Sequence, residues 1–441
     1  MTDTLTNPSR TVTADEVFPV LRDNILVDGF HLVIDLDKSH GTVMVDALEG
    51  KEYLDCYTYF ASLPIGHNHP KMADPEFRET LMRAALSNPA NSDIYTREFA
   101  SFVKTFREVA VPAEFLYLFF VAGGSLAVEN AMKTAFDWKR QKNRAAGVEG
   151  GGDKILHFRE AFHGRSGYTM SVTNTDPGKT RDFPQFEWPR VSNPKMTFPI
   201  DEAAMAAAEA ESVAEIEAAF AADPHGIAGI LLEPIQGEGG DNHFRPEYLQ
   251  RLRDLADKHE ALLIFDEVQT GIGLTGTMWV FQQLGVTPDI VAFGKKTQVC
   301  GIMCTERIDD VPGNVFHVSS RINSTWGGNL VDMVRSARYL RIIEEDNLVE
   351  QAATTGAAFL AELQSLAAEF PQMSNIRGRG LMLAFDMPDS ASRDALRSGL
   401  WDIGLASLAC GDRSIRFRPC LTFTTDDVQR AVVLLRQGLA G

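Results

Sequence analysis

Residues 288–298 read PDIVAFGKKTQ, an apolar run that stops at a glycine and two lysines. A short apolar run without polar alternation is typical of a strand that is buried on both faces of a parallel sheet. Lysine is strongly hydrated, and burying its charge without a partner is costly. Either both Lys295 and Lys296 turn outward into solvent, or one of them gives up its proton and takes part in chemistry.

Four more apolar runs precede turn residues and, in most cases, a helical pattern. They are EFLYLFFVAGG (114–124), DKILHF (153–158), IAGILLEPIQ (227–236) and ALLIFDEVQ (261–269). The stretch TGTMWVFQQLG (275–285) after the last of them is predicted as a helix. This alternation predicts buried parallel strands with crossover helices. Ligands of such sheets bind outside the carboxyl ends of the strands, where most of the unusual polar residues of this chain fall.

The pattern changes after about residue 330. Long amphipathic stretches (331–370) are followed by the short strands RGRGLMLAFDM (377–387) and SIRFRPCLTF (414–423) and by a last helix, DDVQRAVVLLRQGL (426–439). Short strands are also expected at HLVIDLD (31–37) and TVMVDALEG (42–50). We therefore predict an α/β fold in three parts: an N-terminal segment (1–74) that packs with the small domain, a large domain (75–330) with a mostly parallel central sheet flanked by helices, and a smaller α+β domain (331–441).

Composition limits the classes of partner. The 441 residues carry a formal net charge of −18, which argues against binding to nucleic acid or to an anionic membrane. No apolar stretch of eighteen residues is present, and the N-terminus has neither a basic start nor an apolar segment typical of export. The five cysteines form no CxxC pair, so we expect reduced thiols, a cytoplasmic protein and no metal.

Two strand ends carry candidate ligand-binding groups. Gly123, Gly124 and Ser125 fall where a strand gives way to a helix, which is either an anion site at the helix N-terminus or a simple serine cap. Asp266 directly follows an apolar strand, where a carboxylate needs a cationic partner or a metal, and no histidine cluster accompanies it. An acid, a lysine and a phosphate site at neighbouring strand ends meet the needs of pyridoxal phosphate.

The chain resembles the class III (subgroup II) aminotransferases of fold type I, and among them most resembles the bacterial L-lysine 6-aminotransferases. The similarity spans about residues 40–435. It is carried by the motifs AFHGRSGYT, LLEPIQGEGGD, LLIFDEVQTGIGLTG, PDIVAFGKKTQ, NSTWGGN and RFRPCLT.

The resemblance implies a set of cofactor-binding residues. Lys295 is expected to hold pyridoxal phosphate as a Schiff base, and Asp266 to keep the ring nitrogen protonated. The other expected contacts are Gln269 to the phenolic oxygen, Phe162 stacked on the ring, Gly124 and Ser125 at the phosphate, and Thr325 reaching that phosphate from a second subunit. A site shared in this way implies a homodimer.

The resemblance also implies substrates and their binding residues. The ε-amino group of L-lysine is expected to pass to 2-oxoglutarate, which gives L-glutamate and 2-aminoadipate 6-semialdehyde, which cyclises to piperideine-6-carboxylate. Arg165 is expected to bind the distant carboxylate, Arg416 the carboxylate beside the reacting carbon, and Asn323 the α-carboxylate of lysine. Glu238 is expected to pair with Arg416 while lysine is bound and to swing away for 2-oxoglutarate; the alternative is a solvated loop acid.

Other interpretations remain open. Ornithine or 4-aminobutyrate could replace lysine as donor, although Leu126, which stands where most class III members have glutamate, favours the lysine branch. Lys296 is a rival for the role of Lys295; otherwise it faces solvent or the phosphate. The run GIGLTG (271–276) matches a dinucleotide-binding pattern, so an NAD-dependent oxidoreductase is a second class. A third is a non-catalytic protein that holds the cofactor.

Overall fold

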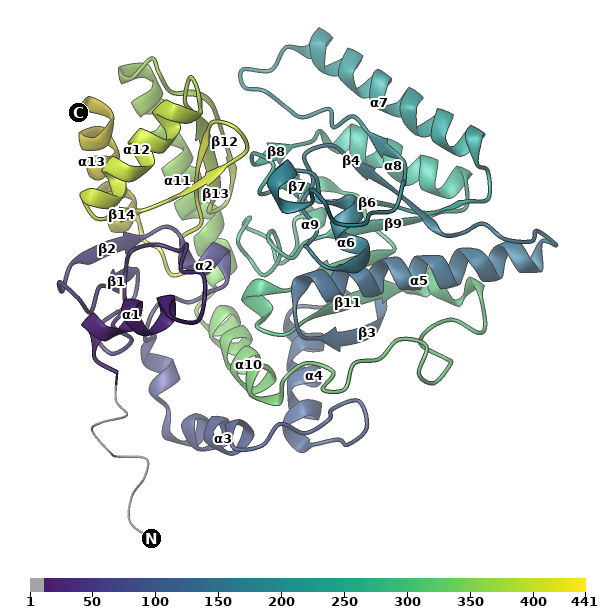
Figure 1. Cartoon of the computed structure of the whole chain (residues 1–441), viewed down its shortest axis with the longest axis horizontal. Coiled ribbons are helices and arrows are strands. Elements are labelled where there is room, and N and C mark those ends of the chain that lie inside the picture. The colour runs from purple at the N-terminus through teal and green to yellow at the C-terminus, as the bar shows by residue number, and fades with distance from the viewer. Residues whose placement is uncertain (1–11) are drawn as a thin grey trace.

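The computed structural model describes residues 12–441, which form two lobes side by side (Figure 1). The larger lobe holds a seven-stranded sheet in the order β3-β11-β10-β9-β6-β4-β5. Its strands are β3 (Phe115–Val121), β4 (Lys154–Phe158), β5 (Arg190–Val191), β6 (Ile227–Leu232), β9 (Leu262–Asp266), β10 (Ile290–Phe293) and β11 (Cys300–Thr305). A small hairpin, β7 (Ile235–Gln236) with β8 (Asn242–His243), lies beyond the end of β6.

The sheet is mostly parallel, as predicted. Strands β5, β4, β6, β9 and β10 pair in parallel along the sheet. β11 is antiparallel to both β10 and β3, so β3 runs in the same direction as β10. Strand β11 is not predicted by the sequence pattern. Only six residues separate β10 from β11, which is too short for a crossover, so the chain must turn back antiparallel.

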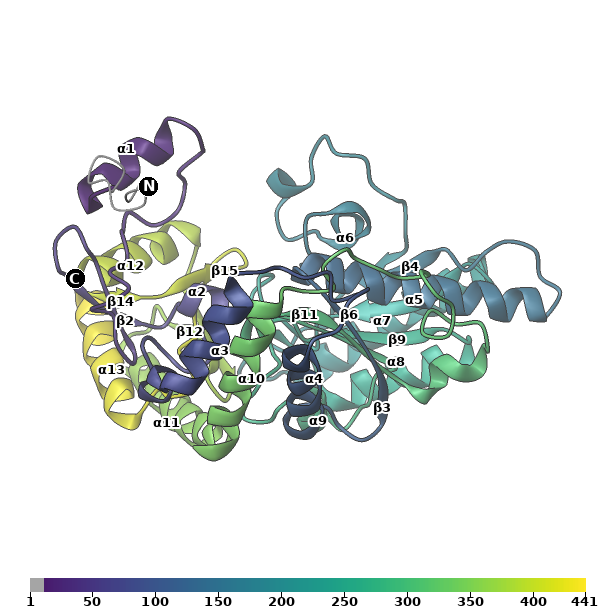
Figure 2. The same cartoon turned by 90° about the horizontal axis from the view of Figure 1, so that it is seen from below.

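Helices cover both faces of this sheet (Figure 2). Ile264 of β9 belongs to the apolar cluster beneath α5 (Gly124–Ala145), whereas its neighbours Leu263 and Phe265 belong to the cluster on the other face, beneath α7 (Glu202–Ala222) and α8 (Pro246–Lys258). All three side chains are fully buried. Burial on both faces explains why the strands are apolar throughout.

The smaller lobe combines the two ends of the described chain. Its four-stranded sheet has the order β12-β13-β16-β15, formed by β12 (Ser374–Arg379), β13 (Met382–Asp386), β15 (Leu408–Cys410) and β16 (Ser414–Phe417). A second sheet joins β1 (Val43–Val45) and β2 (Glu52–Asp55) to β14 (Leu405–Ala406). This pairing supports the division into domains, which we keep as a proposal.

The remaining helices lie around these sheets. They are α1 (Val17–Arg22), α2 (Thr58–Ala61), α3 (Pro75–Ala85), α4 (Arg97–Val109), α6 (Gly167–Val172), α9 (Phe281–Leu284), α10 (Leu330–Glu345), α11 (Leu348–Glu369), α12 (Ser390–Asp402) and α13 (Thr425–Ala440). None of the helices within residues 12–441 is long and apolar enough to cross a membrane.

Two predicted elements are absent or shorter than expected. The segment 31–37 forms no strand and contributes only a bridge from Ile34 to Asp46. The segment 275–285 is turn and bend up to residue 280, and only α9 within it is helical. The Glu267 carboxylate accepts the N–H groups of Val280 (2.8 Å) and Phe281 (3.0 Å), which places the helix start late in the segment.

We expect Leu231→Ala to destabilise the protein by about 2–5 kcal/mol, because this fully buried β6 side chain would leave a cavity beneath α5. The matched substitution Leu36→Ala, at a side chain that is 71% exposed, should change stability by less than about 0.5 kcal/mol. Denaturant unfolding of both variants measures the difference. Equal losses of unfolding free energy in the two variants would contradict the placement of Leu231 in the core.

Candidate active site

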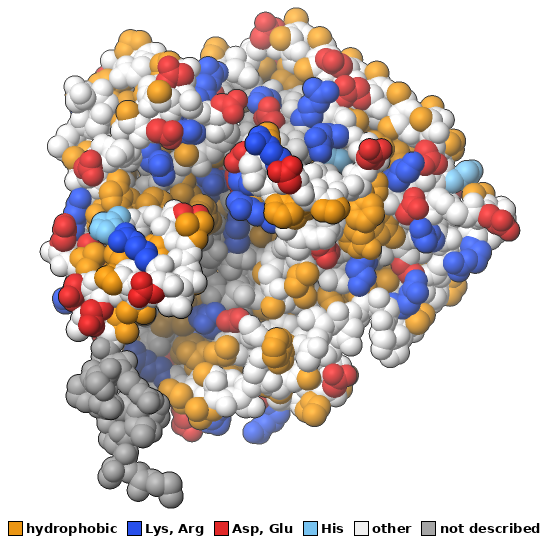
Figure 3. All heavy atoms as spheres, in the orientation of Figure 1, with side chains coloured by type: hydrophobic (Ala, Val, Ile, Leu, Met, Phe, Trp, Pro, Cys, Tyr) orange, Lys and Arg blue, Asp and Glu red, His pale blue; other side chains and the backbone are white. Residues whose placement is uncertain are grey.

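A cavity of about 470 Å³ lies at the carboxyl ends of β9 and β10 and at the start of α5. It brings together all the predicted site residues except Asn323 and Thr325, and adds several that were not predicted. Its lining consists of Tyr59, Phe60, Ser62, Gly124, Ser125, Phe162, His163, Gly164, Arg165, Glu233, Glu238, Asp266, Val268, Gln269, Lys295 and Arg416. The molecular face in Figure 3 is hollowed between the lobes, and Lys and Arg side chains gather beside that hollow.

The start of α5 is open to an anion. Gly123 has φ +106° and gives this helix no side-chain cap, so the first N–H groups stay available. Ser125 is not the cap; its hydroxyl lies 2.6 Å from Thr169 Oγ1. A Cβ on Gly164 would meet Ser125 Oγ at 2.3 Å, so only glycine allows this loop to lie against the helix start.

Asp266 is fixed by two contacts at the end of β9. Its Oδ2 lies 2.8 Å from His163 Nδ1, and its Oδ1 accepts the N–H of Val268 at 3.0 Å. Asp266 is only 6% exposed, and the imidazole is completely buried. His163 was not among the predicted site residues, although it lies in the AFHGRSGYT motif beside Phe162. A buried, oriented carboxylate of this kind suits a cationic nitrogen of a ligand.

The Lys295 amine lies in this cavity, close to other cations. Burial, followed by the charge of Arg416, lowers the pKa of Lys295 to about 8. Its backbone is left-handed, with φ +53°, directly after Gly294. About a tenth of Lys295 is therefore a neutral amine at pH 7, far more than for an ordinary lysine, and this is the form that a nucleophile and proton acceptor requires.

Lys296 neither faces solvent nor lines the cavity, so the alternative placements considered for it are wrong. It is 3% exposed, and its Nζ donates to the carbonyl oxygens of Gln269 (2.7 Å) and Ala61 (3.4 Å). Burial holds its pKa well below the usual value for lysine. The segment that it ties down, Thr58–Ala61, has φ between +43° and +65° and carries the cavity residues Tyr59 and Phe60. Strained backbone of this kind persists only where its surroundings hold it.

Arg416 is buried but has few partners. Its Nη1 lies 3.3 Å from Gln269 Oε1, whereas its Nε has no hydrogen-bond partner among residues 12–441. The same Gln269 oxygen accepts from Arg418 Nη2 at 3.0 Å, and Arg418 also forms a buried ion pair with Asp241. Burial lowers the pKa of Arg416. A buried guanidinium with an unused N–H is suited to a carboxylate ligand.

Glu238 lies at the cavity with a partner that was not predicted. Its carboxylate pairs with Lys179 and not with Arg416. Arg165 is exposed on the loop before α6. Asn323 and Thr325 are exposed on a segment that does not line this cavity of their own chain.

Glu233, also not among the predicted site residues, holds two parts of the site in place. Its carboxylate accepts the N–H groups of Phe162 and Gly237, each at 2.9 Å. Burial raises the pKa of Glu233 to about 7. Its position in the LLEPIQGEGGD motif, at the end of an apolar strand, could have drawn attention to it.

These residues fit pyridoxal phosphate. The uncapped helix start suits the phosphate, the oriented Asp266 suits the pyridine nitrogen, and the Lys295 amine suits the aldehyde. The buried His163 Nε2, which has no partner among the described residues, is a further polar atom left for a bound molecule. No group of three or more His, Cys, Asp or Glu side chains within residues 12–441 could hold a metal ion.

Comparison with known proteins gives a consistent result. Residues 26–439 match the family of class-III aminotransferases. The L-lysine-epsilon aminotransferase of Mycobacterium tuberculosis is 52% identical over 98% of this chain and 96% of its own length. The enzyme of the same name from Streptomyces clavuligerus is 50% identical over 96% and 93%. The solved structure of lysine aminotransferase from M. tuberculosis in the internal aldimine form matches with a TM-score of 0.96 and 52% identity. The match covers 97% of this chain and 99% of that chain.

We expect covalent uptake of pyridoxal phosphate by the apoprotein to accelerate as pH rises, to be half-maximal near pH 8 and to level off above about pH 9. The pKa of Lys295 is lowered to about 8, so the ammonium form prevails below this pH and the reactive amine above it. Uptake is measured by stopped-flow absorbance with borohydride trapping, and Lys295→Ala should take up no covalent label. A rate that keeps rising to pH 10 would show an ordinary lysine.

Proposed function

The chain belongs to the class-III aminotransferases, and on that premise we propose that it transfers the ε-amino group of L-lysine to 2-oxoglutarate. The products would be L-glutamate and 2-aminoadipate 6-semialdehyde, which cyclises to piperideine-6-carboxylate. The observation that best supports this function is the presence of two arginines in one cavity, Arg416 buried on β16 and Arg165 exposed on a loop. Relatives named for this activity cover nearly the whole chain.

Each residue would have a defined task in the reaction. The bound pyridoxal phosphate supplies a carbonyl that receives the amino group and a cationic ring that delocalises negative charge. Lys295, as a neutral amine, would take the proton from the substrate carbon and deliver it to the cofactor carbon that carried the aldehyde. Asp266 keeps the proton on the ring nitrogen, and the N-terminus of α5 at Gly124 and Ser125 binds the phosphate.

Two arginines solve a geometric problem of the paired substrates. Lysine reacts through its terminal amine, so its carboxylate lies far from the reacting carbon, whereas glutamate carries a carboxylate beside it. Arg165 would bind the distant carboxylate and Arg416 the adjacent one. Glu238 would neutralise Arg416 while lysine is bound. An unpaired guanidinium near the apolar chain of lysine would otherwise remain desolvated without a counter-ion.

We expect lysine to exceed ornithine and 4-aminobutyrate in kcat/KM by about tenfold or more with 2-oxoglutarate as acceptor. Ornithine is one methylene shorter, which is worth about 1–3 kcal/mol in a fitted pocket, and 4-aminobutyrate is shorter still and lacks the α-amino group. The assay follows glutamate formation and trapping of the cyclised product. A preference for ornithine or 4-aminobutyrate would reassign the donor. No amino transfer with any donor, together with no covalent cofactor, would refute the function.

We also propose a homodimer in which Thr325 of one subunit binds the cofactor phosphate of the other. The exposure of Thr325, away from its own chain's cavity, supports this arrangement, and the same segment would bring Asn323 to the partner's substrate.

We expect Thr325→Ala to weaken binding of pyridoxal phosphate roughly tenfold to a hundredfold, since a hydrogen bond to a charged group is worth about 1.5–3 kcal/mol. Thr425→Ala, at an exposed position on α13, should leave that affinity unchanged. Fluorescence titration of the apoprotein gives the affinities, and light scattering gives the mass. A monomer with full affinity would overturn the shared site.

A further inference from the structure

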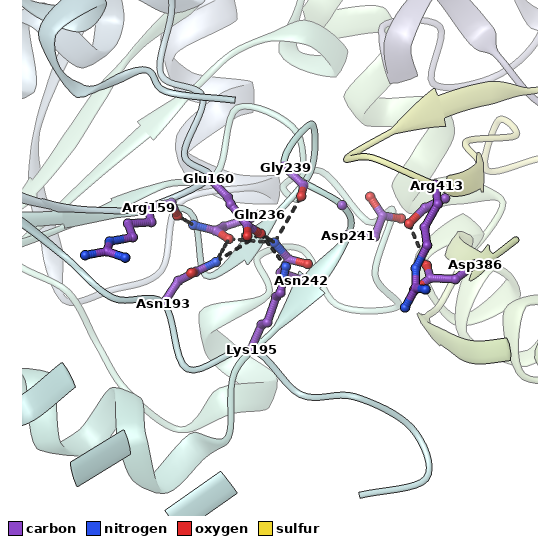
Figure 4. A network of polar contacts seen from close by, with 12 residues as sticks. Arg159, Glu160, Asn193, Lys195, Gln236, Gly239, Asp241, Asn242, Asp386 and Arg413 are labelled. Atoms are coloured by element: carbon purple, nitrogen blue, oxygen red, sulfur yellow. Dashed lines mark hydrogen bonds and ion pairs between the residues drawn. The ribbon is translucent and has the colours of Figure 1, made fainter. Parts of the chain in front are cut away.

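The backbone of Glu238 is held firmly, because the hairpin that carries it is braced at its base. Gln236 Oε1 accepts from Asn193 Nδ2 at 2.9 Å and from Asn242 Nδ2 at 2.8 Å. Glu160 Oε2 accepts from the same Asn242 amide at 2.8 Å and from Lys195 Nζ at 2.6 Å (Figure 4). These contacts join β7 and β8 to the loops that follow β4 and β5.

The tip of the hairpin is fixed by the smaller lobe. The N–H of Gly411 donates to the carbonyl oxygen of Glu238 at 2.8 Å. Arg377 donates from Nε to the carbonyl oxygen of Asp241 at 3.0 Å, and the Asp241 carboxylate pairs with buried Arg418. With its backbone held from both sides, Glu238 can change partners only by rotating its side chain.

Lys179 provides a binding position for that side chain. It ends a short 3-10 turn, Pro177–Lys179, and its Nζ pairs with Glu238 Oε1. The same Nζ lies 3.3 Å from Thr175 Oγ1 and 5.6 Å from the centre of the Phe162 ring. Its side chain is 16% exposed, and burial, then the charge of Arg165, lowers its pKa. A cation in such surroundings depends on a nearby carboxylate.

Lys179 and Arg416 can therefore both pair with the carboxylate of Glu238. Arg416 and Glu238 line the same cavity, and Arg416 has an unused buried Nε while Glu238 is paired with Lys179. While the Glu238 carboxylate pairs with Lys179, it does not pair with Arg416. The strength of the Lys179–Glu238 contact therefore sets how readily Arg416 can bind a substrate carboxylate.

We propose that Lys179 is a specificity-determining residue that holds Glu238 away from Arg416 and so favours substrates with a carboxylate beside the reacting carbon. This inference rests on the proposed function and goes beyond it by identifying the group that receives Glu238 when 2-oxoglutarate or glutamate binds. Lys179 favours the glutamate half-reaction through Glu238 and does not itself bind the substrate.

The first test compares the two half-reactions in Lys179→Met. Single-turnover absorbance of the bound cofactor gives the apparent second-order rate constants for glutamate and for lysine. We expect the glutamate-to-lysine ratio to fall about tenfold, because Glu238 then remains on Arg416. Lys179→Arg, which keeps the cation, should restore the ratio to within about threefold of wild type.

Lys195→Met is the matched control. Lys195 also pairs with a carboxylate, that of Glu160, but at the base of the hairpin and outside the cavity. It should leave the ratio within about twofold of wild type. A tenfold fall in this variant as well would assign the effect to loosening of the hairpin and overturn the proposal.

The Glu238→Gln background separates an indirect role from direct binding. If Lys179 acts through Glu238, adding Lys179→Met to Glu238→Gln should change the ratio by less than about twofold. A further tenfold fall would mean that Lys179 contacts the substrate itself, which contradicts the proposal.

Binding without turnover gives an independent result. Calorimetry of the holoenzyme with glutarate, a dicarboxylate without an amine, should show about tenfold weaker binding in Lys179→Met, whereas binding of hexanoate, a monocarboxylate without an amine, should be affected less than threefold. Equal changes for both ligands would overturn the proposal and leave the proposed function standing. Wild type that reacts with glutamate but not with lysine would refute the lysine function, whereas the glutarate result would still test Lys179 separately.

Discussion

The cost of burying a charged amine without a counter-ion organises this structure. Lys295 occupies a cavity between two lobes, where burial and Arg416 both disfavour the ammonium form. The end of the neighbouring strand β9 offers Asp266, but His163 and the N–H of Val268 fix that carboxylate. The amine is thus left with a reduced affinity for its proton, which is the property that Schiff-base chemistry demands.

Several charged groups around the cavity hold the scaffold in place. Glu233 and Glu267 are buried acids whose pKa values burial raises to about 7, and each accepts two backbone N–H groups. Buried Lys296 joins the loop after β9 to the strained segment beside Tyr59. Polar residues at the strand ends therefore divide into those that face the cavity and those that position the loops carrying them.

The contact between the two lobes fixes the hairpin that carries Glu238, and so affects which substrates the cavity accepts. Arg377 and Gly411 from the smaller lobe hold the hairpin that carries Glu238, and Arg418 joins Asp241 of that hairpin to Gln269 in the cavity. The backbone of the hairpin is fixed from two sides, whereas the Glu238 side chain can rotate between Lys179 and Arg416. A fixed loop with one rotatable carboxylate allows a single cavity to bind two substrates whose carboxylates lie at different distances from the reacting carbon.

The sequence alone determined the parallel strands, the start of a helix at Gly123–Ser125, and the placing of Asp266 and Lys295 at neighbouring strand ends, because apolar periodicity and glycine next to a helix start are local signals. Whether Ser125 capped that helix was decided only by the tertiary structure, which places its hydroxyl against Thr169. It did not reveal β11, the short α9, His163 or Glu233, since each depends on contacts with segments distant in the chain. It placed Lys296 wrongly and could not supply Lys179 as the partner of Glu238. A side chain acquires its partner and its pKa from what surrounds it in space, so only the tertiary structure decided which charges met in the cavity and which were used to hold it together.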